Sequence, residues 1–203
     1  MNVIPIEALQ DNYMYLLVDE STKECAAVDP VEPEKVIRVA NEHKLTLTKI
    51  LTTHHHWDHA NGNPKLLELL GRHVPVYGGD DRIPALDSKV KHDDSFKLGN
   101  LLVSCLFTPC HTTGHICYFV RPENDSCAPV VFTGDTLFIS GCGRFFEGTA
   151  DQMYDALINK LGNLPSNTVC NCFISFFLIN KYFALINNFI RKSTVATNTR
   201  SAI

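Results

Sequence analysis

Short apolar runs separated by polar turns fill the first half of the chain and predict strands over Asn2–Ile6, Tyr13–Asp19, Cys25–Asp29, Lys49–Thr53 and Val74–Tyr77. Two segments have helical character instead, from Pro33 to about Lys44 and from about Asn63 to Leu70. After a polar stretch, the second half predicts strands over Ser95–Leu98, Leu101–Thr108, Ile116–Arg121 and Val130–Thr133. An amphipathic helix over Gln152–Leu161, with Asp151 as its cap, follows them. This mixture predicts an α/β fold in which two sheets pack between helical layers.

The pattern changes after Thr168, where the chain becomes rich in Phe, Ile, Asn, Lys and Tyr. A membrane anchor over Val169–Ile190 would have about the right length, but Lys181 near its centre and several asparagines would be costly in lipid. A buried helix is the second interpretation. We favour a third one, in which a domain of residues 1–168 is followed by an apolar tail, residues 169–203, that does not belong to the parent fold.

Charge and cysteine content restrict the partners and the compartment. The formal net charge is −4 and no basic stripe occurs, so we expect no nucleic-acid partner. Eight cysteines lie at irregular spacings without a paired framework, and the first dozen residues do not resemble a secretory signal. We therefore expect a reducing, cytoplasmic location, no membrane partner, and a monomer, although composition leaves the oligomeric state open.

Four candidate metal ligands lie within six positions after the apolar run Lys49–Thr53: His54, His56, Asp58 and His59. Because a strand alternates its faces, we expect His54 and His56 to point to one side and His55 to the other. Asp58 and His59 would return to the same point from the start of a helix. Imidazole and carboxylate are ligands that zinc, manganese and ferrous iron accept, so the pattern predicts a metal site.

Two distant residues repeat the arrangement of a ligand directly after an apolar strand. His111 follows the strand that ends near Thr108, and Asp135 follows Val130–Thr133. Each alone would be interpreted as a turn or capping residue. Loops at strand ends are where α/β scaffolds carry their chemistry, so beside the histidine cluster both are better interpreted as further ligands.

These residues, in this order, resemble the metallo-β-lactamase superfamily, and most closely its glyoxalase II (hydroxyacylglutathione hydrolase) family. The resemblance extends to about Thr168 and is carried by Asp11–Leu16, Ala27–Pro30, Thr52–His59, Val76–Ile83, Thr108–Thr112, Phe132–Phe138 and Gly141–Gly148. It implies an αββα sandwich, here incomplete at the C-terminus. It also implies hydrolysis of S-(2-hydroxyacyl)glutathione, such as S-D-lactoylglutathione, to glutathione and a 2-hydroxy acid by a metal-bound hydroxide.

The resemblance also implies roles for individual residues. His54, His56 and His111 would hold one divalent ion, most simply Zn²⁺ with Fe or Mn as alternatives, and Asp58 and His59 a second one. Asp135 would bridge them, which makes Asp58 and Asp135 the catalytic carboxylates. His55 and His115 would support the ligands, and Asp29 would orient their loop. Arg144 stands where the family usually has a substrate-binding Lys, and Phe146 where it often has a Tyr.

The chain departs from the family after Thr168. The family continues with a Gly-His-Glu-Tyr segment, whose His is a further ligand of the second metal, and with a helical domain that grips glutathione. Counting forward places Ile174 in the ligand position, and Cys170 or Cys172 is a nearby substitute thiolate. We therefore expect a weakened second site. The alternative function is a truncated chain that binds metal but is weakly active or inactive, and a third is iron-dependent persulfide oxidation.

Overall fold

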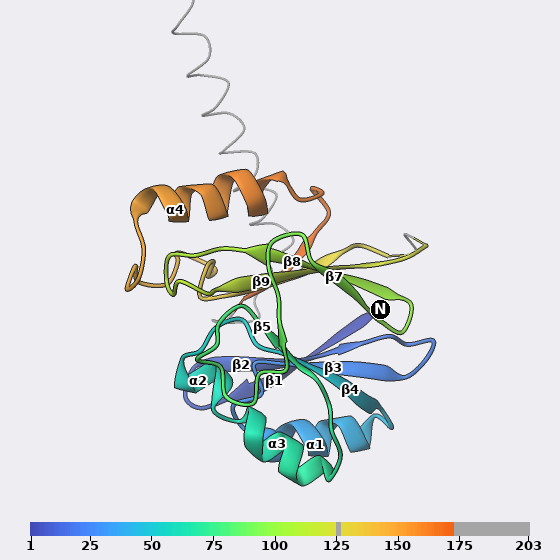
Figure 1. Cartoon of the computed structure of the whole chain (residues 1–203). Coiled ribbons are helices and arrows are strands. Elements are labelled where there is room, and N and C mark those ends of the chain that lie inside the picture. The colour runs from blue at the N-terminus through green and yellow to red at the C-terminus, as the bar shows by residue number, and fades with distance from the viewer. Residues whose placement is uncertain (125–126, 173–203) are drawn as a thin grey trace, which may run out of the picture.

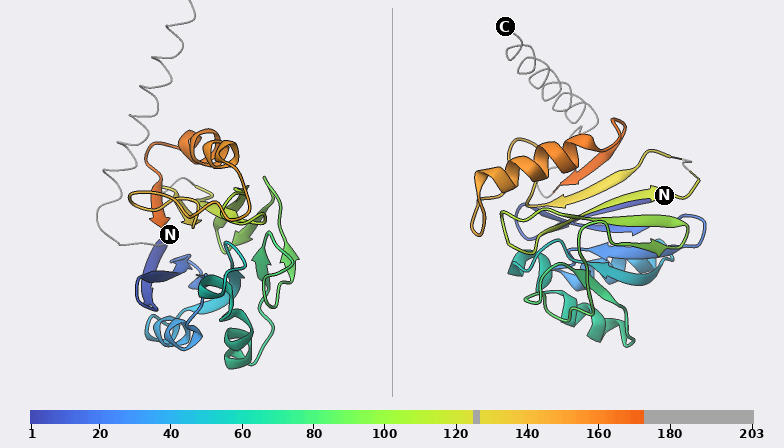
Figure 2. Two further views of the ribbon diagram at one scale, coloured as in Figure 1. Left: turned by 90° about the vertical axis from the view of Figure 1, so that its left-hand side faces the viewer. Right: turned by 45° about the horizontal axis from the view of Figure 1, so that its top comes forward.

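The computed structural model describes residues 1–124 and 127–172, and it arranges them in four layers. Helices α1 (Pro33–Glu42) and α3 (Asn63–Leu70) cover one sheet, and the helical segment that begins with α4 (Ala150–Tyr154) covers the other (Figure 1). The two turned views keep the same stacking of helix, sheet, sheet and helix (Figure 2). The predicted αββα sandwich is therefore confirmed.

The first sheet has six strands in sequential order: β1 (Asn2–Ala8), β2 (Asn12–Val18), β3 (Glu24–Val28), β4 (Thr46–Leu51), β5 (Val76–Gly78) and β6 (Ser88–Lys89). Strands β1 to β3 are antiparallel, whereas β3 to β6 are parallel. The crossovers between the parallel strands carry α1, α3 and the short α2 (Trp57–Ala60). The two-residue β6 lies in the polar stretch before Ser95, where the sequence predicted no strand.

The second sheet has the order β11-β10-β9-β8-β7, and only β10 and β11 are parallel. Its strands are β7 (Ser95–Leu98), β8 (Leu101–Phe107), β9 (Ile116–Pro122), β10 (Val130–Gly134) and β11 (Val169–Cys172). This sheet thus extends past the domain boundary expected after Thr168. The remainder of the tail, including Ile174 and the segment considered as an anchor, lies outside the described residues, so its exclusion from the fold stays a prediction.

Alternation along the strands divides the core into three apolar layers. In β2, Met14, Leu16 and Val18 pack under α1 and α3, whereas Tyr15 and Leu17 pack against the second sheet. A third cluster, which includes Leu161, lies between the second sheet and the last helical segment. Strands buried on both faces need continuous apolar runs, which is why the sequence contained them.

The helical segment expected over Gln152–Leu161 is present, as α4 followed by a π-helical segment, Asp155–Lys160, and a 3-10 turn, Leu161–Asn163. Its cap is Thr149, not Asp151, because the Thr149 hydroxyl accepts from Gln152 N while the Gln152 side chain accepts from Thr149 N. Among the described residues, no helix is both long and apolar enough to cross a membrane.

One buried phenol joins the two sheets beside the loop after β4. The Tyr118 hydroxyl lies 2.9 Å from the Thr52 carbonyl oxygen and 3.1 Å from that of Tyr77, and its ring is fully buried. We expect Tyr118→Phe to lower the free energy of unfolding by about 1–2 kcal/mol, because both carbonyls lose a donor. Urea denaturation measures this, with Tyr154→Phe, at an exposed ring, as the control. Equal midpoints for the two variants would contradict the assignment.

Candidate metal centre

The histidine-rich turn begins where β4 ends, at Leu51 and not at Thr53 as the sequence suggested. His54 to His56 therefore lie in irregular backbone, and strand alternation does not set their directions. His56 is the N-cap residue of α2, which carries Asp58 and His59. His54 and His59 are fully buried. The short helix, and not a continued strand, thus directs the later ligands inward.

Three imidazoles converge at the first position. The His56 Nδ1 atom lies 3.1 Å from His54 Nε2 and 3.0 Å from His111 Nε2. Two nitrogen ligands at the usual distance from a tetrahedral zinc ion lie about 3.3 Å apart, so this spacing fits an ion between the three rings. The structure brings together the three residues that the sequence predicted for this position.

Asp135 lies between this group and a second one. Its Oδ2 atom lies 3.2 Å from His111 Nε2, and its Oδ1 atom lies 3.2 Å from His59 Nε2. Each carboxylate oxygen thus faces a different imidazole, and Asp135 lies between the two groups. Gly134 makes this approach possible, since it has φ +45° and a Cβ there would lie 2.6 Å from Thr53 Oγ1.

The second group differs in one member from the sequence prediction. Ligand atoms of His54, His59 and Asp135 all lie within 4.8 Å of one another, so His54 is close to both groups. Asp58 lies at the margin, with Oδ2 3.8 Å from His59 Nε2. The Asn12 amide donates to this Asp58 oxygen at 3.4 Å and to the Asp58 carbonyl at 3.3 Å. Sequence reasoning missed this contact, although Asn12 belongs to a segment that carried the resemblance.

Buried polar partners fix the orientation of the rings. Asp29 Oδ2 accepts from His59 Nδ1 at 2.8 Å and from the Thr53 hydroxyl at 2.7 Å, while Asp29 Oδ1 accepts from Thr53 N at 2.7 Å. The Arg144 carbonyl accepts from His111 Nδ1 at 2.8 Å. Both contacts leave Nε2, the atom that faces the site, as the ligand nitrogen. The expectation that Asp29 orients the ligand loop agrees with this geometry.

The two supporting histidines lie outside both ligand groups. His115 Nε2 accepts from Asp135 N at 3.1 Å, and its Nδ1 atom lies 2.9 Å from the Thr108 hydroxyl. His55 points toward Asp80, with Nδ1 3.5 Å from Oδ2. Thus His115 holds Asp135 in place by accepting from the backbone N–H of Asp135, and His55 links the ligand turn to the loop after β5.

Burial keeps most of the cluster in the form that binds metal. Desolvation, reinforced by neighbouring imidazoles, holds the pKa of His54 well below its usual range, and desolvation lowers that of His56. Desolvation also lowers the pKa of His115 to about 3. Burial would lower the pKa of His59 too, but the carboxylates of Asp29 and Asp135 raise it to about 10. His54 and His56 are therefore neutral at pH 7, whereas His59 carries a proton beside the two carboxylates.

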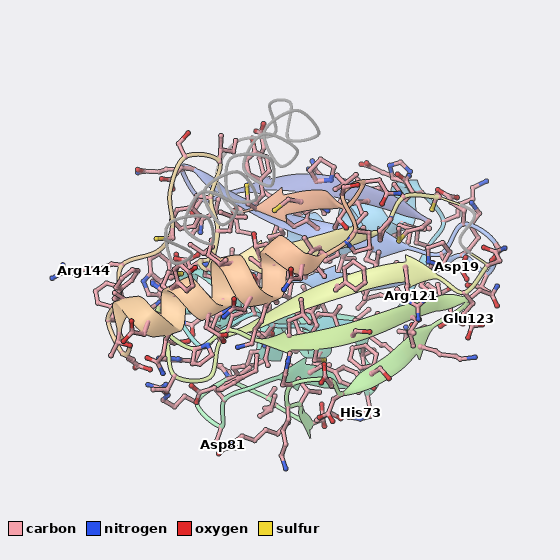
Figure 3. The ribbon with its side chains drawn as sticks, turned by 90° about the horizontal axis from the view of Figure 1, so that it is seen from above. Asp19, His73, Asp81, Arg121, Glu123 and Arg144 are labelled. Carbon is pink, nitrogen blue, oxygen red and sulfur yellow. The ribbon has the colours of Figure 1, made fainter. Side chains whose placement is uncertain are left out.

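The two residues predicted to bind substrate lie at the mouth of the cluster. The Phe146 ring centroid is 5.3 Å from that of His111 and 5.8 Å from that of His56, and 58% of this residue is exposed. The Arg144 guanidinium stacks over Phe146 at 5.3 Å and extends outward at one end of the molecule (Figure 3). Trp57, 62% exposed and adjacent in sequence to His56, is a further aromatic that sequence reasoning did not select.

The cysteines considered as substitute ligands lie in another layer. Cys170 and Cys172 belong to the buried cluster with Cys117, Val131 and Leu161, under the last helical segment. Neither is a member of a ligand group found among residues 1–124 and 127–172. Nothing in the described part of the chain therefore supports rescue of the second position by a thiolate.

Comparison with known proteins places this site in a family context. A profile of the metallo-beta-lactamase superfamily matches residues 10–170. The chain is 46% identical to a hydroxyacylglutathione hydrolase-like protein of Gallus gallus, over 91% of this chain and 65% of that protein. It is 48% identical to the cytoplasmic hydroxyacylglutathione hydrolase of Arabidopsis thaliana, over 91% of this chain and 72% of that protein. The crystal structure of ETHE1 from Myxococcus xanthus superposes with a TM-score of 0.75 at 29% identity, covering 94% of this chain and 89% of that one.

Asp29 offers a test of the second position. In Asp29→Asn, an amide N–H facing His59 Nδ1 would favour the tautomer with hydrogen on Nε2, the atom that faces the site. We expect affinity for the more weakly held metal ion to fall about 10- to 100-fold, measured by competition with a chromogenic chelator. Asp93→Asn, which alters the exposed His92–Asp93 pair, is the matched control. An unchanged affinity in Asp29→Asn would show that this carboxylate does not orient a ligand.

Proposed function

Because this chain belongs to the metallo-β-lactamase superfamily and, within it, to the hydroxyacylglutathione hydrolase family, we propose that it hydrolyses S-(2-hydroxyacyl)glutathione thioesters. The products would be glutathione and a 2-hydroxy acid, and S-D-lactoylglutathione is the substrate we propose. The chain spans 65% to 72% of the length of the two relatives compared above. The observation that carries the proposal is the convergence of two ligand groups on the Asp135 carboxylate.

We assign His54, His56 and His111 to one divalent ion and Asp58 and His59 to a second, with Asp135 between them. Imidazole and carboxylate ligands fit Zn²⁺, Fe and Mn alike. Among these metals we propose Zn²⁺. When bound, such a pair of ions supplies a Lewis acid for the thioester carbonyl and lowers the pKa of the attacking water.

The chain's own residues perform the remaining tasks. Asp58 is the more exposed carboxylate, with 28% of its side chain accessible against 14% for Asp135, so it is the one able to accept a hydrogen bond from the attacking water. Asp135 lies between His59 and His111 and keeps these two imidazoles at a fixed separation. The leaving thiolate belongs to a thiol with an ordinary pKa near 8.5, so its departure requires no strong acid from the protein.

Glutathione would lie along the rim. The exposed Arg144 guanidinium can form a bidentate pair with a substrate carboxylate, and the Phe146 ring offers an apolar surface to the glutathione. Phenylalanine lacks the hydroxyl of the family's tyrosine, so one polar contact to the substrate is lost. We propose a cytoplasmic location, as the name of the A. thaliana relative states for that protein.

A chain that binds metal but turns over slowly is the competing proposal. It is consistent with the share of the relatives that this chain spans. Steady-state hydrolysis of S-D-lactoylglutathione, with metal content measured on the same sample, separates the two. Two ions per chain without thioester hydrolysis would overturn the hydrolase proposal.

Loss of the bridging ligand should abolish turnover. Removing a residue that merely supports a ligand costs about 10- to 100-fold, so we expect Asp135→Asn to lower kcat at least about 100-fold and to reduce bound metal. The control is Asp81→Asn, at a carboxylate that pairs with Lys89 and whose side chain is 79% exposed. Unaltered kcat in Asp135→Asn would remove this residue from the mechanism.

Arg144 should affect binding more than chemistry. A hydrogen bond to a charged group contributes about 1.5–3 kcal/mol, and the exposure of Arg144 favours the lower end. We therefore expect Arg144→Gln to raise KM about 10-fold with little change in kcat, and Arg144→Lys to raise it less. Equal KM values for Arg144→Gln and the unaltered protein would exclude a substrate contact.

A further inference from the structure

We propose that Arg82 and Glu147 are positioning residues that hold the segment 143–148 over the mouth of the metal centre. This segment carries Arg144 and Phe146, so the inference rests on the proposed function, and it names residues that the sequence did not select. Neither side chain belongs to a ligand group. Their role would be to keep the substrate-binding segment in place.

The segment has no regular structure of its own. Residues 142–148 form neither helix nor strand, and α4 begins only at Ala150. Two backbone hydrogen bonds attach the segment to the ligand loops, from Gly143 N to the Asp135 carbonyl at 2.7 Å and from Glu147 N to the Cys110 carbonyl at 3.2 Å. Between these two points, Arg144, Phe145 and Phe146 are exposed. The position of the segment therefore depends on how well its end at Glu147 is held.

Glu147 is held by side-chain contacts that reach two other loops. Its Oε1 atom accepts from Arg82 Nη1 at 2.6 Å, and its Oε2 atom accepts from Arg82 Nη2 at 2.8 Å. The same Oε2 atom accepts from Thr113 N at 2.7 Å and from the Thr113 hydroxyl at 2.9 Å. Planar guanidinium and carboxylate groups match in this forked pairing, which fixes direction as well as distance.

Arg82 is fixed in turn by a buried carboxylate. Its Nε atom lies 2.9 Å from Asp80 Oδ1, and its Nη2 atom lies 2.6 Å from Asp80 Oδ2. Asp80 itself is buried and faces His55 in the ligand turn. A single guanidinium thus joins the carboxylates of Asp80 and Glu147, although Arg82 and Glu147 lie 65 positions apart in the sequence. This chain of contacts connects the loop after β5 to the substrate-binding segment.

Solvent exposure decides what this ion pair can do. The side chains of Arg82 and Glu147 are 44% and 27% exposed, so water screens their attraction and the pair contributes little to global stability. The hydrogen bond to Arg82 nevertheless lowers the pKa of Glu147, so the pair stays charged at neutral pH. The pair therefore adds little to the stability of the whole protein, but its well-defined geometry orders the segment 143–148 locally.

The ordering matters because one segment serves both parts of the site. The Arg144 carbonyl accepts from His111 Nδ1. The Arg144 guanidinium and the Phe146 ring, which stack on each other, are the two groups proposed to contact the substrate. Glu147 directly follows Phe146, so displacement of its carboxylate shifts both substrate contacts together. Since both groups are proposed to bind the glutathione part of the substrate, their displacement should act on substrate binding and not on the chemical step.

Kinetics of Glu147→Gln and Arg82→Gln test the proposal. We expect each variant to raise KM about 10-fold, with kcat within about 2-fold and metal content unchanged. The double variant should be no worse than either single one, because the two residues act as one unit. The control is Lys97→Gln, which breaks the exposed Lys97–Glu123 pair of 2.7 Å; Figure 3 shows Glu123 at the end of the molecule opposite Arg144. Constants equal to those of Lys97→Gln, or a loss of metal, would overturn it.

A second measurement does not depend on catalysis. Trypsin cleaves after arginine, and cleavage at Arg144 requires the segment to open locally. We expect Glu147→Gln to increase the rate of cleavage after Arg144 several-fold over the unaltered protein and Lys97→Gln, with fragments identified by mass spectrometry. Equal rates would disprove the positioning role. If the unaltered protein hydrolyses no thioester but Glu147→Gln opens the segment, only the proposed function fails.

Discussion

The candidate site depends on one carboxylate that reaches two imidazoles from different layers. Asp135 follows β10 in the second sheet, whereas His59 lies on α2 beside the first sheet, and His111 follows β8. One carboxylate oxygen of Asp135 lies 3.2 Å from His59 Nε2, and the other lies 3.2 Å from His111 Nε2. Such spacing can persist only if the two sheets keep a fixed register, and the apolar layer between them provides this constraint.

Burying so many polar groups in one place would be unfavourable without a specific partner for each. Desolvation keeps His54 and His56 neutral, so the cluster avoids several adjacent positive charges. His59 is the exception, because it carries a proton whose positive charge is balanced by the carboxylates of Asp29 and Asp135. A divalent ion could replace that proton, since both carboxylates would then pair with the ion's charge. The same polar framework therefore suits both the protonated and the metal-bound site.

Much of the fold and the site could be predicted from the sequence, because strands buried on both faces and clustered histidines leave local patterns. The helix expected from Asp151 was misplaced at its start, since the reciprocal cap of Thr149 and Gln152 competes successfully for that role. The end of β4 was also missed, because it depends on the turn into α2. The Arg82–Glu147 pair was beyond sequence reasoning, since only the packing of three loops brings residues 65 positions apart together.

An anomalous-diffraction map of the metal-loaded protein, recorded at the absorption edge of the bound metal, tests whether two ions lie at this site. We expect two peaks about 3.5–4 Å apart on either side of the Asp135 carboxylate. One of them should be surrounded by His54, His56 and His111, and the other should lie next to His59. A single peak remote from Asp135, or a peak among the cysteines of the outer layer, would contradict this expectation.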